Sequence, residues 1–314
     1  MSTPQASMVL AVPDLISTSY FPAVAAVQLG VFQEEGLDVR LERISPVNRC
    51  MEALRDGSIQ FAAASAHALP AAFPEWKGAR LLAALSQNMY WFLVLRKSLQ
   101  AKKGDISAVK GLSIGAAPWV DAGLKKLLAD AGIDEERDGV KIGPVPGAFL
   151  GDNMNFGVAA AKALEAGLID GFWANGMGAE VAVRSGAGDV VIDARRGDGP
   201  PQARGYTFAA LVCSDAFIQA RPEAAAAAVR ALVKTQQRLK ADPGLASKAT
   251  QDIFPAEQTA LIQELIERDL PFYSAEISRR TVDSLNDFQA AMGLVKAPVA
   301  YEDAVATQYA DLWQ

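Results

Sequence analysis

Apolar and polar positions along the chain alternate between two periods, and this predicts strands that take turns with helices. The clearest case runs from Glu52 to His67 (EALRDGSIQFAAASAH), which gives a helix end, a stop at Gly57, an apolar strand and then Ser-Ala-His. Glycine suits the left-handed position after a helix because it adopts positive φ without steric cost. A strand whose only polar side chain is Gln60 is expected to be covered on both faces, as in a parallel sheet between helices.

The same phrase returns later in the chain. Lys162 to Gly176 (KALEAGLIDGFWANG) again gives a helix end, a glycine, a short apolar strand and then Trp-Ala-Asn. Ligands of parallel sheets sit outside the carboxyl ends of the strands. Two copies of this phrase therefore predict two similar α/β lobes, each of which presents a strand end to a ligand.

The remaining pattern predicts further alternation of strands and helices. Strands are expected at Met8–Val12, Leu37–Ile44, Arg80–Leu85, Phe92–Leu95, Leu112–Ala116, Val140–Val145, Asp189–Asp193 and Tyr206–Val212. Helices are expected at Phe21–Gly30, Val47–Asp56, His67–Trp76, Asp121–Ala131, Asn155–Ala166, Met177–Ser185, Pro222–Lys240, Pro255–Arg268 and Ala275–Met292.

Two of the expected strands are interpreted as crossings between the lobes, Phe92–Leu95 outward and Tyr206–Val212 back. Residues 1–95 and 206–314 would then form the first lobe, and residues 96–205 the second. At 314 residues the chain exceeds the usual size of a single core, which agrees with two lobes.

Composition narrows the function classes. The chain is 51% hydrophobic and 21% charged, as in ordinary globular proteins. Its net charge of -6 offers no electrostatic footprint for nucleic acid or anionic lipid, so neither is expected as a partner. One histidine, His67, and two cysteines, Cys50 and Cys213, do not supply the spaced ligands of a zinc site. No metal or cofactor is expected, and two buried free thiols are favoured over a disulfide.

The start of the chain, MSTPQASMVLAV, lacks the basic region and long apolar run of a secretory signal. No stretch approaches the ~18 apolar residues that a membrane span needs. Either the protein is cytoplasmic, or a signal has been removed ahead of residue 1. The sequence leaves both possibilities open.

The segment from Leu29 to Leu41 (LGVFQEEGLDVRL) resembles the G-x-F-x-x-E-G-L-D-V phrase of the NMT1/SsuA/ThiY-like family. Asp105-Ile106 with Lys110-Gly111 matches that family's D-L-x-G-K lead-in to its second lobe. The resemblance implies an α/β, two-lobed type II periplasmic-binding-protein fold, in which each lobe is a mixed sheet flanked by helices and two strands form the hinge. It also implies a periplasmic, monomeric solute-binding protein that closes over a small ligand and delivers it to an ABC permease.

Carried over position by position, the resemblance implies a ligand site made of loop residues at strand ends. The implied ligand-binding residues are Ser17, Ser19, Tyr20, Ser65, His67, Asn88, Trp91, Trp119, Trp173 and Asn175. Helices that start after Ser19, Ser65 and Pro118 would aim backbone N–H groups at the ligand, which favours an anionic group on it.

Each of these residues also has an ordinary structural explanation. Trp91, Trp119 and Trp173 are three of five tryptophans and all fall at predicted strand ends, yet each alone is as well explained by core packing. Together with Tyr20 they favour a ligand with a flat or aromatic portion. His67 is more ordinarily a hydrogen-bonded structural histidine, and the two asparagines could cap turns.

An enzyme on the same scaffold is the alternative function. Fungal thiamin-pyrimidine synthases resemble this chain, but the stretch before His67 (FAAAS) has no lysine for a Schiff base, and no cysteine cluster exists. Biphenyl-sulfinate desulfinases carry a cysteine nucleophile near the position of Ser19. An activated Ser19 would need His67 as its base, and the sequence does not show that the two meet.

Overall fold

The computed structural model describes residues 7–148 and 155–314, and these divide into two compact units. The first unit comprises Met1–Gln87 and Thr207–Gln314, and the second comprises Asn88–Tyr206. The expected boundary after residue 95 is therefore corrected, because the strand that begins at Phe92 pairs entirely within the second unit's sheet. Each unit is described by itself below.

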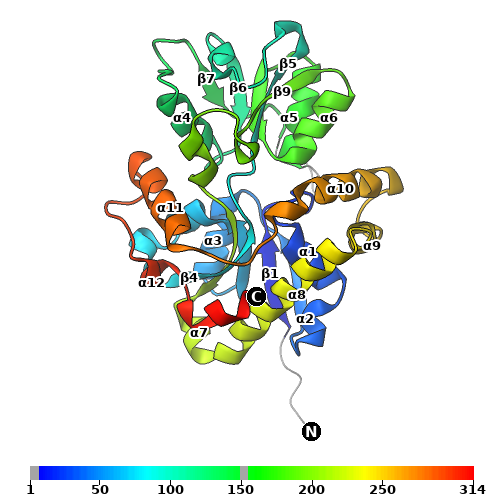
Figure 1. Cartoon of the computed structure of the whole chain (residues 1–314), viewed down its shortest axis with the longest axis vertical. Helices are drawn as coiled ribbons and strands as arrows, with labels where there is room; N and C mark the ends of the chain where they lie inside the picture. Colours follow the sequence, from blue (N-terminus) through cyan, green and yellow to red (C-terminus); the bar gives the residue numbers. More distant parts are fainter. Residues whose placement is uncertain (1–6, 149–154) are drawn as a thin grey trace. The chain divides into compact units, whose positions relative to one another are not determined.

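The first unit is built on a mixed sheet of five strands (Figure 1). Its order is β2 (Val39–Arg43), β1 (Met8–Val12), β3 (Phe61–Ser65), β10 (Ala209–Ser214) and β4 (Ala79–Ser86). β1 runs parallel to β2 and β3, whereas β10 is antiparallel to β3 and β4. The carboxyl ends of β1 and β3 therefore lie side by side at one edge, where the expected site residues follow them.

Helices cover this sheet on both sides, as the apolar β1 and β3 predict. They are α1 (Phe21–Gln28), α2 (Val31–Glu34), α3 (Val47–Arg55), α7 (Asp215–Ala220), α8 (Pro222–Ala241), α9 (Leu245–Thr250), α10 (Ala256–Asp269), α11 (Arg279–Ala291) and α12 (Tyr301–Ala304). The alanine-rich face of α8 packs against α1 and α2. All the C-terminal helices belong to this unit, as the sequence indicates.

The second unit repeats the plan with a smaller set of elements (Figure 1). Its sheet order is β7 (Lys141–Gly143), β6 (Ser113–Ala116), β8 (Gly171–Ala174), β5 (Phe92–Arg96) and β9 (Gly188–Asp193). β6 is parallel to β7 and β8, and β5 is antiparallel to β8 and β9. Three α-helices accompany this sheet in the described residues, namely α4 (Asp121–Asp130), α5 (Phe156–Glu165) and α6 (Gly176–Arg184).

Most expected elements are confirmed to within a few residues. They include β1 and the strands β3 and β8, which lie within the two repeated phrases. Gly57 and Gly167 adopt φ of 74° and 70°, as the left-handed position after a helix requires. The helix expected at His67–Trp76 is wrong. Two 3₁₀ helices, η1 (Ala66–Ala71) and η2 (Pro74–Trp76), stand there, because Pro70 and Pro74 cannot donate the amide bonds of a continuous α-helix.

Both cysteines are free and buried, as favoured from the sequence. Burial raises the pKa of both thiols, and Cys50 is one of the buried residues of α3. The Cys50 thiol donates to the carbonyl oxygen of Ile44 at 2.8 Å. Neither thiol is therefore primed as a thiolate nucleophile at neutral pH.

Candidate functional site

The loop after β1 and the end of β3 come together in the first unit, as parallel neighbours predict. The Tyr20 hydroxyl lies 3.0 Å from Ser65 Oγ, and both side chains are buried. We call Ser17, Thr18, Ser19, Tyr20 and Ser65 the hydroxyl cluster. Every member is at most 4% exposed. Five hydroxyl groups so deeply placed at the carboxyl ends of two parallel strands form a polar surface within an apolar core.

Ser17 is the member of this cluster with an unused polar atom. Its amide donates to Asp14 Oδ1 at 2.5 Å, and its carbonyl oxygen accepts the amide of Tyr20 at 3.1 Å. Its hydroxyl oxygen is buried and has no hydrogen-bond partner in the described residues. A buried polar group left unpaired costs about 1–3 kcal/mol, so such an atom in a native fold calls for an explanation.

His67 is buried at the start of η1 and is held on several sides. Its Nδ1 lies 3.0 Å from the hydroxyl of Thr207, and its carbonyl oxygen accepts from Gln289 Nε2 at 3.2 Å. Its ring meets Phe288 edge-on, with 5.5 Å between the ring centroids. These contacts favour the structural role for His67 that the sequence left open.

In the second unit, Trp91 and Trp173 come together beside β5 and β8. Their ring centroids lie 6.2 Å apart in an edge-on arrangement, and the ring of Tyr90 lies 5.1 Å from that of Trp91. We call Tyr90, Trp91 and Trp173 the aromatic cluster. A Cβ on Gly123 of α4 would come within 2.9 Å of Trp91, so glycine is needed where this helix covers the rings.

Trp173 also has a buried polar atom without a hydrogen-bond partner. The side chain is fully buried, yet its indole nitrogen Nε1 has no hydrogen-bond partner in the described residues. Phe172, the neighbouring residue, points to the opposite face and packs in the core formed with α5 and α6. The period of the strand thus places Trp173 on the face of the sheet next to Gly123 of α4.

Trp119 and Asn88 share an uncommon backbone conformation. Their φ angles are 71° and 64°, in the left-handed region that large L residues avoid. Trp119 lies in the turn before α4, and the carbonyl oxygen of Asn88 accepts from Arg195 Nη2 at 3.3 Å. Strained conformations of this kind cost about 1–3 kcal/mol and gather at binding and switch regions.

Asn175 is the N-cap of α6. Its Oδ1 accepts the amide of Gly178 at 3.1 Å, and its Nδ2 donates to Asn155 Oδ1 at 3.4 Å. Asn155 in turn caps α5 by accepting the amide of Val158 at 3.2 Å. The ordinary explanation of Asn175 as a cap therefore holds, with the addition that it connects two helix N-termini.

Some residues in or beside these clusters are not predicted from the sequence. Thr18 lies between two of the expected serines, and the polar run LISTSY around it is the signal that identifies it. Asn155 could have been found as an Asn that precedes a helical run. Asp269 and Tyr273, which contact Thr18, carry no local signal, since they lie about 250 positions away along the chain.

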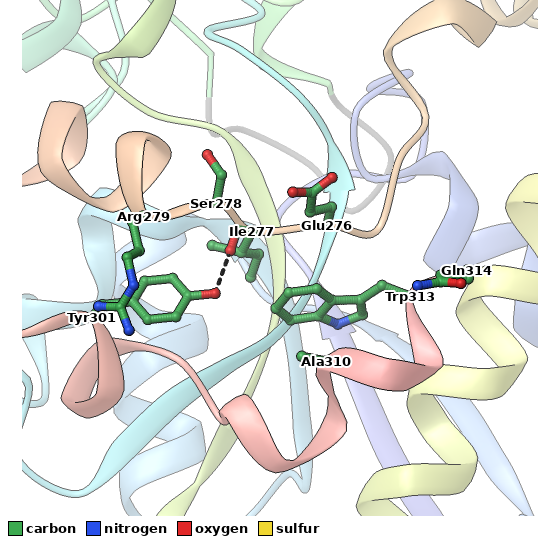
Figure 2. A pocket seen from close by; sticks show the side chains of 8 residues that line it. All are labelled: Glu276, Ile277, Ser278, Arg279, Tyr301, Ala310, Trp313 and Gln314. Atoms are coloured by element: carbon green, nitrogen blue, oxygen red, sulfur yellow. Dashed lines mark hydrogen bonds between the residues drawn. The ribbon is translucent and has the colours of Figure 1, made fainter.

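A separate pocket of about 450 Å³ lies in the first unit near the end of the chain (Figure 2). Its lining residues are Glu276, Ile277, Ser278, Arg279, Tyr301, Ala310, Trp313 and Gln314, none of which the sequence singled out. The Tyr301 hydroxyl donates to the carbonyl oxygen of Ile277 at 2.6 Å, and the Arg279 guanidinium lies over the Tyr301 ring at 4.5 Å. The Trp313 indole donates outside the lining, to the carbonyl oxygen of Leu82 at 2.9 Å.

Two broader properties concern residues 7–148 and 155–314. Among them no helix is both long and apolar enough to span a bilayer. The same residues hold no group of three or more histidine, cysteine, aspartate or glutamate side chains arranged to bind a metal ion.

Comparison with known proteins places the sequence in a family. The model of the NMT1-like family matches residues 4–253. No curated protein matches the chain. Among solved structures, a Bordetella bronchiseptica RB50 protein is 20% identical with a TM-score of 0.77, covering 98% of this chain and 96% of that one.

Two other solved structures of similar fold are a sulfonate-binding protein and a protein in complex with a sulfinate. The putative sulfonate ABC transporter, periplasmic sulfonate-binding protein SsuA, from Methylobacillus flagellatus KT, is 17% identical with a TM-score of 0.69, covering 97% of this chain and 92% of that one. A DszB mutant in complex with biphenyl-2-sulfinic acid is 14% identical with a TM-score of 0.65, covering 96% and 97%. At these identities the likeness shows the fold alone, which is that of periplasmic binding proteins, as expected from the sequence.

Proposed function

The chain belongs to the NMT1-like family, and from this premise we propose that it is the solute-binding protein of an ABC importer. Its ligand is a small organic anion with a flat or aromatic portion. The sulfonate-binding protein of similar fold supports the transport role, and the biphenyl-2-sulfinate complex of another supports a flat sulfur-oxyanion ligand. The proposal includes a periplasmic location and a permease as partner.

One observation carries the proposal. Each unit holds a buried polar atom without a partner at a place that the sequence marked for ligand binding, Ser17 Oγ in the hydroxyl cluster and Trp173 Nε1 in the aromatic cluster. Both groups can donate a hydrogen bond to an oxyanion. Hydrogen bonds to charged groups contribute about 1.5–3 kcal/mol, which would offset the cost of leaving these donors unpaired in the unliganded protein.

In this proposal the hydroxyl cluster and the aromatic cluster are each a candidate surface for ligand contact. A ligand that interacts better with a closed form than with an open form shifts the population towards the closed form. That differential binding is the mechanism expected of a clamp, and it requires no cofactor.

The first test is a thermal-shift screen of the purified protein. The compounds are aromatic and aliphatic sulfonates, biphenyl-2-sulfinate, aromatic carboxylates, pyrimidines and thiamin precursors. A ligand present at a hundredfold excess over Kd stabilises the native state by about 2.7 kcal/mol, which raises Tm measurably. We expect stabilisation by a flat anion and none by its uncharged analogue.

The matched variants are Ser17→Ala and Ser58→Ala. Ser17 Oγ has no partner to lose, so S17A should keep the Tm of the unliganded protein and reduce the ligand-induced shift. Ser58 is exposed and donates to the carbonyl oxygen of Ala53, so S58A should leave the ligand-induced shift unchanged. Equal ligand-induced shifts in both variants would remove Ser17 from the site.

The enzyme alternative is favoured by one observation, the fold likeness to DszB, and is tested on the same samples. Every stabilising compound is incubated with the protein and then analysed by mass spectrometry. Recovery of the unchanged compound supports transport, whereas recovery of a product assigns catalysis. In the latter case Ser19 and His67 are the residues to replace first.

A further inference from the structure

Thr18 makes two hydrogen bonds to residues at and just beyond the C-terminal end of α10. Its hydroxyl donates to Asp269 Oδ2 at 2.5 Å, and its carbonyl oxygen accepts the hydroxyl of Tyr273 at 2.6 Å. Thr18, Asp269 and Tyr273 are 4%, 1% and 0% exposed. Side chain and backbone of one loop residue are thus both fixed by a segment that lies about 250 positions further along the chain.

The local structure explains why Asp269 and Tyr273 face Thr18 together. α10 ends at Asp269, and the single 3₁₀ turn η7 (Leu270–Phe272) follows it directly. The amide of Tyr273 closes this turn by donating to the carbonyl oxygen of Leu270 at 3.1 Å. The tight turn therefore spaces the carboxylate and the phenol hydroxyl to reach two atoms of the same residue.

The segment that carries the two groups is itself attached to the sheet. The amide of Gln87, just after β4, donates to the carbonyl oxygen of Phe272 at 2.8 Å. The amide of Ala84, within β4, donates to the carbonyl oxygen of Ala275 at 2.9 Å. The contacts on Thr18 therefore rest on the rigid sheet and not on a freely placed helix end.

We infer that Asp269 and Tyr273 are positioning residues for the ligand site, which act through Thr18 on the loop formed by Ser17, Ser19 and Tyr20. Thr18 lies between the unpaired Ser17 hydroxyl and the Tyr20 that contacts Ser65. The two bonds fix the hydroxyl and the carbonyl group of Thr18. Because consecutive residues share planar peptide groups, this also restricts the backbone orientation of the neighbouring residues. The role in ligand binding rests on the proposed function, whereas the ordering of the loop does not.

The experiment uses two pairs of variants in the full chain. Thr18→Val removes the hydroxyl at nearly constant shape, and Thr18→Ser keeps it. Tyr273→Phe removes the donor to Thr18, and its control Tyr301→Phe removes a tyrosine-to-carbonyl bond of the same 2.6 Å length, to Ile277 in the pocket of Figure 2. Both phenylalanine variants lose one hydrogen bond of the same kind, so an effect on general stability alone should be similar in both.

The first readout is hydrogen–deuterium exchange of the segment 14–20 in the unliganded protein. We expect T18V and Y273F to raise its exchange rates by roughly tenfold. Each variant lacks one of the two hydrogen bonds on Thr18, so local opening of the segment costs less free energy than in the wild type. T18S and Y301F should match the wild type in this segment. Wild-type exchange in both T18V and Y273F, or equal exchange in Y273F and Y301F, would overturn the inference.

The second readout is the dissociation constant of biphenyl-2-sulfinate, measured by calorimetry. We expect T18V and Y273F to weaken binding by roughly three- to tenfold and T18S to restore it, as the loss of one well-oriented hydrogen bond implies. Unchanged affinity in T18V and Y273F, with the loop loosened, would overturn the positioning role. If the wild type does not bind this probe, the proposed ligand class fails, while the exchange readout still decides whether the two residues order the loop.

Discussion

The two units share one sequence pattern, a helix end, a glycine and an apolar strand, but different side chains follow the strand in each unit. In the first unit the strand end at Ser65 leads into a 3₁₀ helix, and the Ser65 hydroxyl contacts Tyr20 without capping that helix. In the second unit the strand end leads to Asn175, which caps a regular α-helix. The first unit thus presents buried hydroxyl groups, and the second presents aromatic rings on the face of its sheet next to Gly123 of α4.

This difference predicts a different kind of ligand contact in each unit. Hydroxyl groups recognise oxygen atoms by hydrogen bonds, whereas large rings contact flat or apolar surface. The Trp173 Nε1 atom, a buried donor without a partner in the described residues, shows that the aromatic cluster is not purely apolar. The comparison therefore predicts separable effects on stability and on affinity, depending on which unit and which atom is changed.

The largest effect on stability is expected when the Trp173 side chain of the aromatic cluster is truncated. Trp173 is fully buried, so Trp173→Ala should lower the free energy of unfolding by about 3–5 kcal/mol. Urea denaturation of the variant measures the loss.

Trp119→Gly is the contrasting variant. Trp119 is only partly buried and adopts φ of 71°, a conformation that glycine takes without strain. Relief of strain should offset the lost ring contacts, so we expect a change in unfolding free energy below about 1 kcal/mol. Weaker ligand binding by W119G at unchanged stability would assign Trp119 to the site, and unchanged binding would remove it.

A smaller and more specific effect is expected from Trp173→Phe, which keeps a ring but removes the unpaired N–H. Because Nε1 has no partner in the described residues, the stability of the unliganded protein should fall only by the cost of the shape change, under about 1.5 kcal/mol. Affinity for an anionic ligand should fall about tenfold, equivalent to about 1.4 kcal/mol.

Trp313→Phe provides the control for this change. Its indole donates to the carbonyl oxygen of Leu82 at 2.9 Å, so W313F breaks a hydrogen bond that already exists. We expect W313F to lower stability by about 1 kcal/mol and to leave affinity unchanged. The opposite pattern, with W173F affecting only stability, would mean that the Trp173 N–H serves the fold and not the ligand.

The sequence predicted the sheet arrangement well because burial imposes a simple pattern on it. β1, β3 and β8 are apolar runs, of which β1 is stopped by Pro13 while Gly57 and Gly167 precede β3 and β8, and parallel pairing then places the residues that follow β1 and β3 together. The contact between Tyr20 and Ser65 follows from this. The boundary between the units near Phe92 could not be predicted in this way, because a buried apolar strand has the same sequence pattern in either sheet.

Contacts between distant segments could not be predicted from local patterns. Nothing in the residues around Asp269 indicates that its carboxylate meets Thr18, since a helix ending in Arg-Asp-Leu-Pro is equally typical of an exposed terminus. Pro70 and Pro74 are a signal for the 3₁₀ helices after Ser65. The apolar run around them nevertheless predicts one continuous α-helix, which does not form. Whether Trp173 is buried was also undecided, because strand-end tryptophans occur in cores and in sites alike.

A still smaller effect on stability should follow from the cap of α6. Asn175→Ala should cost about 1 kcal/mol, since it removes the acceptor for the Gly178 amide. Asn175→Asp keeps a good N-cap and adds a negative charge that the helix N-terminus favours, so its stability should stay near the wild type. If the ligand is an anion held nearby, N175D should nevertheless bind it more weakly than N175A. Equal affinities in a calorimetric titration would separate the α6 terminus from the anion.

The smallest effect is expected at a surface cluster of the first unit that lies outside both clusters of candidate site residues. Hydrogen bonds from Arg238 and Lys234 on α8 lower the pKa of Glu34 on α2 from 4.5 to about 2. A carboxyl group with a lowered pKa in the folded state contributes stability above its unfolded pKa and loses it as the pH falls through the folded value. The contribution should thus be complete above about pH 5 and disappear towards pH 2, and it should be small because exposed ion pairs are screened.

Glu34→Gln tests this baseline by comparing its Tm with that of the wild type between pH 7 and pH 2. The difference in Tm should be slight at pH 7, shrink as the pH falls below 4.5, and shrink also in 1 M salt, because salt screens exposed charges. Ligand affinity at pH 7 should be the same in both proteins, since α2 and α8 carry none of the candidate site residues. A loss of affinity in E34Q would mean that the helices behind the sheet influence the site as strongly as the loop at Thr18, and the contrast between the two units would then no longer explain binding.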